Sequence, residues 1–120
     1  MSMDRTTYII AGYDLTNCKT DKYEDWSWTD EGEEYSCYTT KGKIQLFDDS
    51  LNGNYLYLGY ILARIDDDGD YDAEMINPEY ISEVMQDVVQ KLMELEEKGV
   101  ITGLVSLQSD YKLIVFDEWS

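Results

Sequence analysis

The hydrophobic residues of this chain are most concentrated in its middle, where residues 55–63 form an uninterrupted apolar segment. This segment continues through Arg64 and Ile65 into an acidic row at residues 66–74. A short apolar run rich in Tyr, Leu and Ile that ends at a polar segment containing glycine is typical of a strand buried on both faces. The pattern therefore predicts the central strand of a sheet, followed by an acidic segment at the surface.

Shorter runs of β-branched and aromatic residues predict the remaining strands, which we place at residues 6–13, 35–39, 43–47, 100–107 and 111–116. Gly42 after Lys41 predicts a turn, and Gly53 after Asn52 predicts the reversal into the central strand. Residues 16–34 are polar, with too little periodicity for a helix or a long strand. They predict an irregular segment at the surface that its tryptophan side chains fix to the rest of the protein.

The strongest local signal is a helix start at Asn77-Pro78-Glu79, with an N-cap, a proline at the first helical position and an acid in the first turn. Apolar residues recur at three and four positions and predict one amphipathic helix over about residues 78–97, ending before Gly99. Its predicted apolar stripe comprises Ile81, Val84, Met85, Val88, Leu92 and Leu95. On the polar face, i,i+4 ion pairs are expected between Asp87 and Lys91 and between Glu94 and Lys98.

Together these elements predict the fold class α+β, as a single domain over residues 1–120. The expected sheet is mainly antiparallel with about five to six strands, and the long helix packs on one of its faces. A homodimer that pairs sheet edges stays open as an arrangement.

The charge narrows the choice of partners, because 26 acidic residues stand against 9 basic ones and give a formal net charge of −17. Such a chain repels nucleic acid and anionic membranes and attracts basic surfaces or cations. Eleven Tyr and three Trp accompany the charge, and these side chains commonly anchor protein interfaces. The start of the chain lacks a signal-peptide pattern and no apolar run is long enough to span a bilayer, so we expect a cytoplasmic protein with reduced Cys18 and Cys37.

The acidic row is the first candidate for a binding site, because five carboxylates alternate along it: Asp66, Asp68, Asp70, Asp72 and Glu74. In an extended segment all five point to one side at steps of about 6.6 to 6.8 Å. This step is of the same order as the phosphate spacing along the backbone path of a DNA strand, which favours phosphate mimicry. A solvated, solubilising loop is the alternative interpretation.

A calcium site is a weaker interpretation of the same row. With Gly69 at position six of an EF-hand loop, the first ligand position falls on Arg64 and the twelfth on Met75. Residues 48–53 fit the first half of such a loop better, but their twelfth position is Gly59 inside the central strand. We therefore predict no metal ligands and no cofactor.

Further partner-binding residues are expected outside the row. Trp26 and Trp28 would form one aromatic anchor ringed by charge if their segment is extended, because alternate residues of a strand point the same way. The polar helix face adds Glu79, Glu83 and Asp87. No catalytic residues are predicted, since the chain has no histidine and no glycine-rich phosphate loop. We expect a protein that is not an enzyme.

Four segments carry a resemblance: YIIAGYDLT at 8–16, YEDW at 23–26, GKIQLFDD at 42–49 and GNYLYLGYI at 53–61. In these the chain resembles a group of small proteins found in phages and prophages of Gram-positive bacteria, over about its first half. The resemblance implies a genomic setting and no activity. In size and charge the chain is also similar to acidic DNA mimics of phages, including anti-restriction and anti-CRISPR proteins.

The expected function is inhibition of a host defence or other nucleic-acid-binding protein, such as a nuclease or CRISPR effector, by occupying its basic surface. Two alternatives stay open. One is an immunity protein that neutralises a basic nuclease toxin, and the other is a non-enzymatic structural or assembly protein of the virion.

Overall fold

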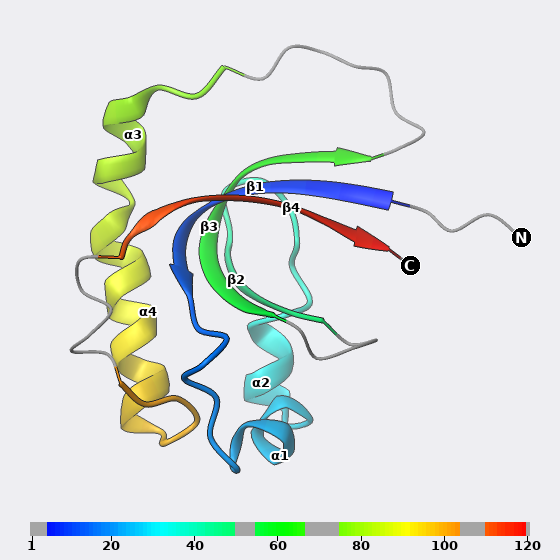
Figure 1. The fold of residues 1–120 in the computed structure, drawn as a ribbon, viewed down its shortest axis with the longest axis vertical. Helices are drawn as coiled ribbons and strands as arrows, with labels where there is room; N and C mark the ends of the chain where they lie inside the picture. The colour runs from blue at the N-terminus through cyan, green and yellow to red at the C-terminus, as the bar shows by residue number, and fades with distance from the viewer. Residues whose placement is uncertain (1–4, 50–54, 67–74, 104–109, 120) are drawn as a thin grey trace, which may run out of the picture.

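The computed structural model describes residues 5–49, 55–66, 75–103 and 110–119. Within these residues the fold is α+β, with one antiparallel sheet in the order β2-β3-β1-β4 and a long bent helix along one side (Figure 1). The strands are β1 (Arg5–Asp14), β2 (Ile44–Asp48), β3 (Leu56–Asp66) and β4 (Lys112–Trp119). The described sheet has four strands, where the sequence predicted about five to six.

The predicted central strand is confirmed, because β3 pairs with β2 on one side and with β1 on the other. Its residues Leu58 and Ile61 point to opposite faces of the sheet, and both are fully buried. Between Ile9 and Ile10 of β1 the register with β3 shifts, as at a β-bulge. A bulge bends its strand and increases the local twist, and β1 and β3 are strongly curved in Figure 1.

The predicted helix is confirmed in its extent, as α3 (Pro78–Glu83) and α4 (Met85–Glu97). Its start follows the predicted chemistry, since the side chain of Asn77 accepts a hydrogen bond of 3.0 Å from the amide of Glu79. The helix bends at Val84, although the Val84 amide still donates to the Tyr80 carbonyl at 3.1 Å. It ends before Gly99, whose φ of +77° lies in the left-handed region that favours glycine.

The bend allows both halves of the helix to follow the curved sheet. Val84 packs against Leu62, whereas Leu92 and Leu95 pack farther along against Leu58. Val84, Val88, Leu92 and Leu95 of the predicted stripe are buried, while Ile81 and Met85 are half-buried. The predicted apolar face is therefore confirmed, with its centre displaced toward the carboxyl end.

The predicted ion pairs of the helix are wrong in their partners. Lys91 Nζ lies 3.7 Å from Glu94 Oε2, an i,i+3 contact, and Lys98 pairs with Glu31 outside the helix. Glu94 also accepts a hydrogen bond of 3.0 Å from the Tyr35 hydroxyl. Tertiary contacts therefore decide which carboxylate each lysine meets.

Two predictions in the first half of the chain are wrong. The polar excursion contains two short helices, α1 (Tyr23–Ser27) and α2 (Asp30–Glu34), and the predicted strand at residues 35–39 does not form. Thr29 starts α2 by accepting a hydrogen bond of 3.1 Å from the Gly32 amide. The ring of Tyr35 is buried in the core while residues 36–38 are all exposed, so the alternation of a half-buried strand is absent.

Of the predicted strand at residues 100–107, only Ile101 forms a bridge, with Lys19, and residues 104–109 lie outside the described residues. Cys18 is buried and Cys37 is exposed, and both are free thiols. In the part of the chain that the structure describes, no helix is long and apolar enough to cross a membrane.

Candidate functional site

The two faces of the sheet differ in what covers them. The helix α3–α4 lies on the convex side of the curved strands (Figure 1). The opposite side, which we call the aromatic face, carries rings from all four strands or from residues that adjoin them: Tyr8, Phe47, Tyr55, Tyr57 and Phe116. The ring centroids of Tyr8 and Phe47 lie 4.8 Å apart, and those of Tyr55 and Tyr57 are stacked at the same distance. No described helix contributes to this cluster.

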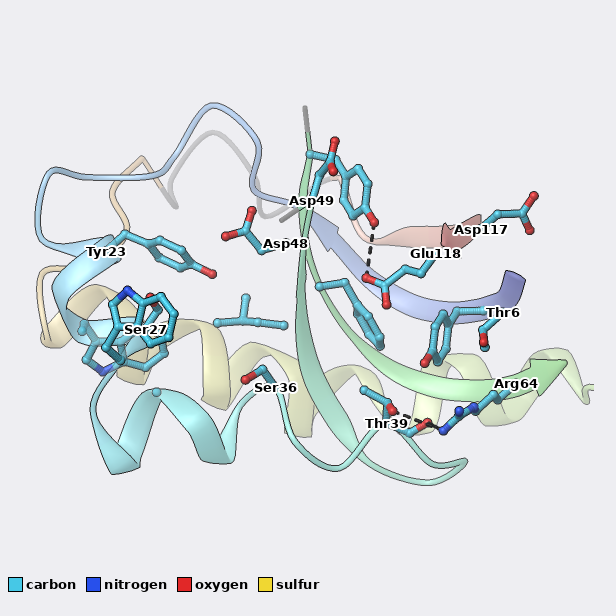
Figure 2. Close-up of a pocket in the computed structure, with 17 residues that line it drawn as sticks. Thr6, Tyr23, Ser27, Ser36, Thr39, Asp48, Asp49, Arg64, Asp117 and Glu118 are labelled. Atoms are coloured by element: carbon cyan, nitrogen blue, oxygen red, sulfur yellow. Dashed lines mark hydrogen bonds between the residues drawn. The ribbon is translucent and has the colours of Figure 1, made fainter. Parts of the chain in front are cut away.

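A cavity of about 650 Å³ lies between the aromatic face and the segment that contains α1 and α2 (Figure 2). Tyr23 and Ser27 of this segment lie at one end, and Thr6 and Arg64 lie at the other. Its size falls within the range of typical ligand sites. Aromatic side chains in its wall are Tyr8, Tyr23, Trp26, Trp28, Phe47 and Tyr55.

Four acidic residues line this cavity, namely Asp48, Asp49, Asp117 and Glu118. The side chain of Asp117 points to the other face of β4, where its carboxylate accepts a hydrogen bond from the Thr7 hydroxyl. Glu118 accepts a hydrogen bond of 3.3 Å from the Tyr55 hydroxyl. Burial raises the pKa of Glu118, and the nearby charges of Asp49 and Asp48 raise it further, whereas the Tyr55 hydrogen bond and Arg64 lower it. Burial also raises the pKa of Tyr55, which keeps its hydroxyl as a donor.

The guanidinium of Arg64 is held at one end of the cavity by several contacts. Its Nη1 donates to the carbonyl and the hydroxyl of Thr39, each at 3.3 Å, and its Nε lies 3.3 Å from Asp66 Oδ1. The guanidinium carbon also lies 5.8 Å from the centroid of the Tyr8 ring, within cation–π range. Arg64 is therefore already neutralised and positioned by this chain.

These contacts give Asp66 a structural role, because it holds Arg64 and also accepts a hydrogen bond of 3.1 Å from Thr6. It is the last residue of β3 and is exposed. The other predicted members of the acidic row, Asp68, Asp70, Asp72 and Glu74, lie outside the described residues.

The predicted anchor of Trp26 and Trp28 is wrong in its geometry, because Trp26 lies in a helix and Trp28 follows its end. Trp26 packs between the rings of Tyr23 and Tyr35, at centroid distances of 5.9 Å and 5.3 Å, and its buried Nε1 has no hydrogen-bond partner. Trp28 remains 79% exposed. Both side chains line the cavity, but only Trp28 is available to a partner at the surface.

The densest described concentration of acidic residues is the segment 21–34, which we call the acidic lobe. Its seven carboxylates are all exposed: Asp21, Glu24, Asp25, Asp30, Glu31, Glu33 and Glu34. Lys22 is the single basic residue of the segment. The lobe borders the cavity through Tyr23, Trp26 and Trp28.

The predicted helix residues Glu79, Glu83 and Asp87 are exposed on α3–α4 and do not line this cavity. The hydrogen bond with Tyr80 is the main cause that raises the pKa of Tyr60 to about 12, and the charge of Asp87 raises it slightly further. The structure therefore separates the helix carboxylates, on the convex side of the sheet, from the acidic lobe and the cavity.

Sequence reasoning missed the cavity and its residues Tyr55, Arg64, Asp48 and Glu118. The alternation of Phe116 and Glu118 in the last strand was the only available signal, because such residues share a face of a strand. Among the described residues, no group of three or more acidic or cysteine side chains is placed to hold a metal ion.

Comparison with protein-family models finds no match for this chain, and comparisons with curated proteins and with solved structures also find none.

Proposed function

We propose that this protein inhibits a nucleic-acid-binding protein of a phage host by occupying that protein's basic surface in place of nucleic acid. The observation that carries the proposal is the acidic lobe, where seven exposed carboxylates meet two lysines, Lys22 within the segment and Lys98, which pairs with Glu31. The phage setting rests on the resemblance of the first half of the chain, and the choice of a nucleic-acid-binding partner rests on charge.

The distribution of charge supports binding by complementarity. No Asp or Glu among the described residues is fully buried and most are exposed, so most of their charges act on the solvent and on an approaching partner. A surface of one sign accelerates the encounter with a basic protein and makes the affinity fall as salt rises. The same sign keeps nucleic acid itself away from this chain.

The test begins with capture of host proteins by the purified protein at low salt, followed by release at high salt and identification by mass spectrometry. Each released protein is then incubated with labelled DNA or RNA to measure displacement by this protein. We expect one basic nucleic-acid-binding protein whose ligand is displaced in a salt-dependent way.

Matched variants locate the surface that acts. The lobe variant carries Asp21→Asn, Glu24→Gln and Asp25→Asn, and the helix variant carries Glu79→Gln, Glu83→Gln and Asp87→Asn, so each removes three charges. We expect the lobe variant to displace nucleic acid at least tenfold less well and the helix variant to resemble the natural chain. Equal losses of displacement in the two variants would show that only total charge matters. If the captured partner releases no nucleic acid when this protein binds, the proposal is refuted.

A third variant tests the acidic row, with Asp66, Asp68, Asp70, Asp72 and Glu74 replaced by Asn or Gln. Unchanged affinity and unchanged salt dependence would remove the row from the binding surface. Capture of a toxin nuclease encoded beside this gene would instead favour the immunity-protein alternative.

A further inference from the structure

We propose that the cavity between the aromatic face and the acidic lobe receives an arginine side chain of the basic partner. This inference rests on the proposed function and adds the chemistry by which the partner is recognised. The cavity combines carboxylates with aromatic rings, which are the two kinds of group that bind a guanidinium.

Charge complementarity is the first argument for this occupant. The carboxylates of Asp48, Asp49 and Glu118 line the cavity against the single guanidinium of Arg64, while that of Asp117 accepts a hydrogen bond from Thr7 on the other face of the sheet. Arg64 is already paired with Asp66, which is not among the lining residues. The wall therefore favours a further positive charge, and Lys19 meets only one of its carboxylates, with its Nζ 3.7 Å from Asp48 Oδ2.

The aromatic surface is the second argument. Trp28 is 79% exposed beside the acidic lobe and lines the cavity, so its indole can be covered by a partner side chain. Tryptophan gives the strongest cation–π contact among the aromatic residues, and buried tryptophans often contribute most of the affinity of an interface. A guanidinium stacks on such a ring better than an ammonium does, because it is planar and weakly hydrated.

Arg64 provides an example of this recognition inside the molecule. Its guanidinium lies over the Tyr8 ring while it contacts Thr39 and the Asp66 carboxylate. Toward the other end of the cavity, the partner's arginine would meet Trp28 as the ring and Asp48 as the carboxylate. Glu118, which lies opposite Thr6 in the sheet, would be the second carboxylate, on the side nearer Arg64. The volume of about 650 Å³ accommodates the side chain together with part of the loop that bears it.

The carboxylates are arranged for an organic cation and not for a metal ion. In the described part of the chain no three acidic side chains converge on a common point, as the six to eight oxygen ligands of calcium would require. A guanidinium instead presents five N–H donors that spread over several acceptors. The separation of the carboxylates along the cavity, seen in Figure 2, suits this geometry.

The experiment measures binding of a labelled, capped tetra-arginine peptide by fluorescence anisotropy at about 150 mM salt. Capped tetra-lysine and tetra-citrulline peptides of the same length are the controls. We expect the tetra-arginine peptide to bind most tightly, and the Trp28→Ala and Glu118→Gln variants each to weaken its binding about five- to tenfold. The Glu96→Gln variant removes one charge from the exposed end of α4 and should change the affinity less than twofold.

The outcomes separate this inference from the proposed function. Equal binding of tetra-lysine and tetra-arginine, or equal effects of Glu118→Gln and Glu96→Gln, would overturn the arginine site. If the lobe variant no longer binds the captured partner while the Trp28→Ala variant still binds it, the proposed function stands. The cavity is then not the site that recognises this partner. Circular dichroism of Glu118→Gln checks the fold, and Trp28→Phe should restore part of the affinity that Trp28→Ala loses.

Discussion

Gly12 of β1 and Gly59 of β3 lie directly opposite each other in the antiparallel pair at the centre of the sheet. A Cβ atom on Gly12 would lie 1.9 Å from the Leu58 carbonyl oxygen, and one on Gly59 would lie 2.8 Å from Cδ1 of Ile10. The two strands therefore approach each other here more closely than any side chain permits. Glycine in the interior of a strand often marks such a close approach of two backbones.

Replacing Gly12 by Ala should destabilise the fold by about 3 kcal/mol or more, because the added methyl group meets backbone that can only shift with the sheet. The matched control is Gly42→Ala in the turn before β2. Gly42 has a φ of +93°, but its Cβ would meet only the Tyr60 hydroxyl at 3.7 Å. Its replacement should cost about 1 to 2 kcal/mol. Urea unfolding measures both values, and equal losses would contradict the steric argument.

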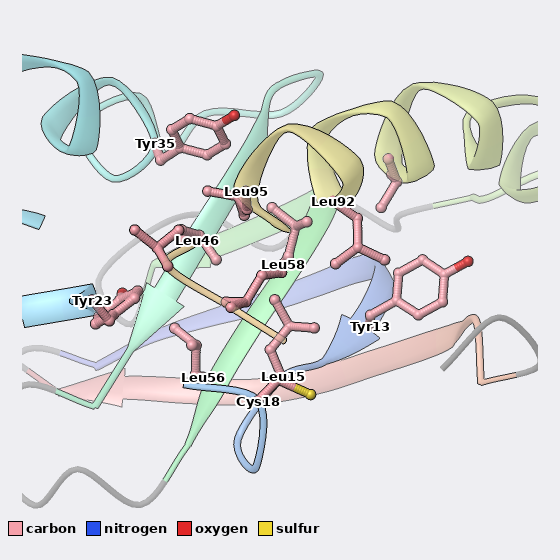
Figure 3. Packing of buried hydrophobic residues seen from close by; sticks show 13 residues of the cluster. Tyr13, Leu15, Cys18, Tyr23, Tyr35, Leu46, Leu56, Leu58, Leu92 and Leu95 are labelled. Carbon is pink, nitrogen blue, oxygen red and sulfur yellow. The ribbon is translucent and has the colours of Figure 1, made fainter. Parts of the chain in front are cut away.

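A second prediction concerns the core between α4 and the sheet. Leu95 is fully buried and points from α4 toward the sheet near Leu58 (Figure 3). Leu95→Ala should lower the free energy of unfolding by about 2 to 5 kcal/mol through lost burial and the remaining cavity. Met93 lies on the same helix and is 62% exposed, so Met93→Ala should change stability by less than about 0.5 kcal/mol. Similar losses for both would show that α4 is not packed as described.

The long helix could be predicted because its signals are local. Asn77 and Pro78 set its start, Gly99 sets its end, and the apolar spacing sets its buried face. The strand at residues 35–39 could not be excluded in this way. Its residues have high strand propensity, but the Tyr35 ring packs on Trp26 and its hydroxyl bonds to Glu94, 59 residues away. Contacts of such long range override a local preference.

The cavity could not be predicted from the sequence, because it too depends on contacts between distant segments. Trp28, Tyr55 and Glu118 come from three separate segments, and only the curvature of the sheet brings them to one cavity. The surface position of the carboxylates at residues 21–34 could be predicted from their charge, but the two short helices could not. Once the backbone there is helical, Trp26 and Trp28 no longer point the same way, and one becomes half-buried while the other stays exposed.

A third prediction is that moderate salt stabilises this protein. The acidic side chains that give the net charge of −17 repel one another most strongly in the compact state, where they lie closest together. Salt screens the repulsion between charges that lie more than about 8 to 10 Å apart. Raising sodium chloride from about 20 mM to 300 mM should increase the midpoint of thermal unfolding by about 4 °C, which corresponds to about 1 kcal/mol. The lobe variant, with three charges removed, should start from a higher midpoint and gain less. An equal gain in the two proteins would show that repulsion within the lobe does not limit stability.

The last prediction follows from the burial of Glu118. Its pKa is raised in the folded state above an ordinary value of 4.5, so the folded chain holds this proton more tightly than the unfolded chain does. The resulting stabilisation is present at low pH and is lost as the pH rises through the folded-state pKa. At pH 7 the natural chain therefore carries a desolvated carboxylate beside Asp49 and Asp48, partly offset by the Tyr55 hydroxyl and Arg64.

Glu118→Gln should accordingly raise the midpoint of thermal unfolding at pH 7.5, since the amide keeps an acceptor for the Tyr55 hydroxyl and removes the charge. The gain should shrink as the pH is lowered toward 5, which stays above the isoelectric point of about 4.1 where the protein would precipitate. Glu96→Gln, on the exposed surface of α4, removes the same charge and should give a smaller gain at pH 7.5. If the two variants gain equally at every pH, desolvation of Glu118 does not act on stability, and the effect is one of net charge alone.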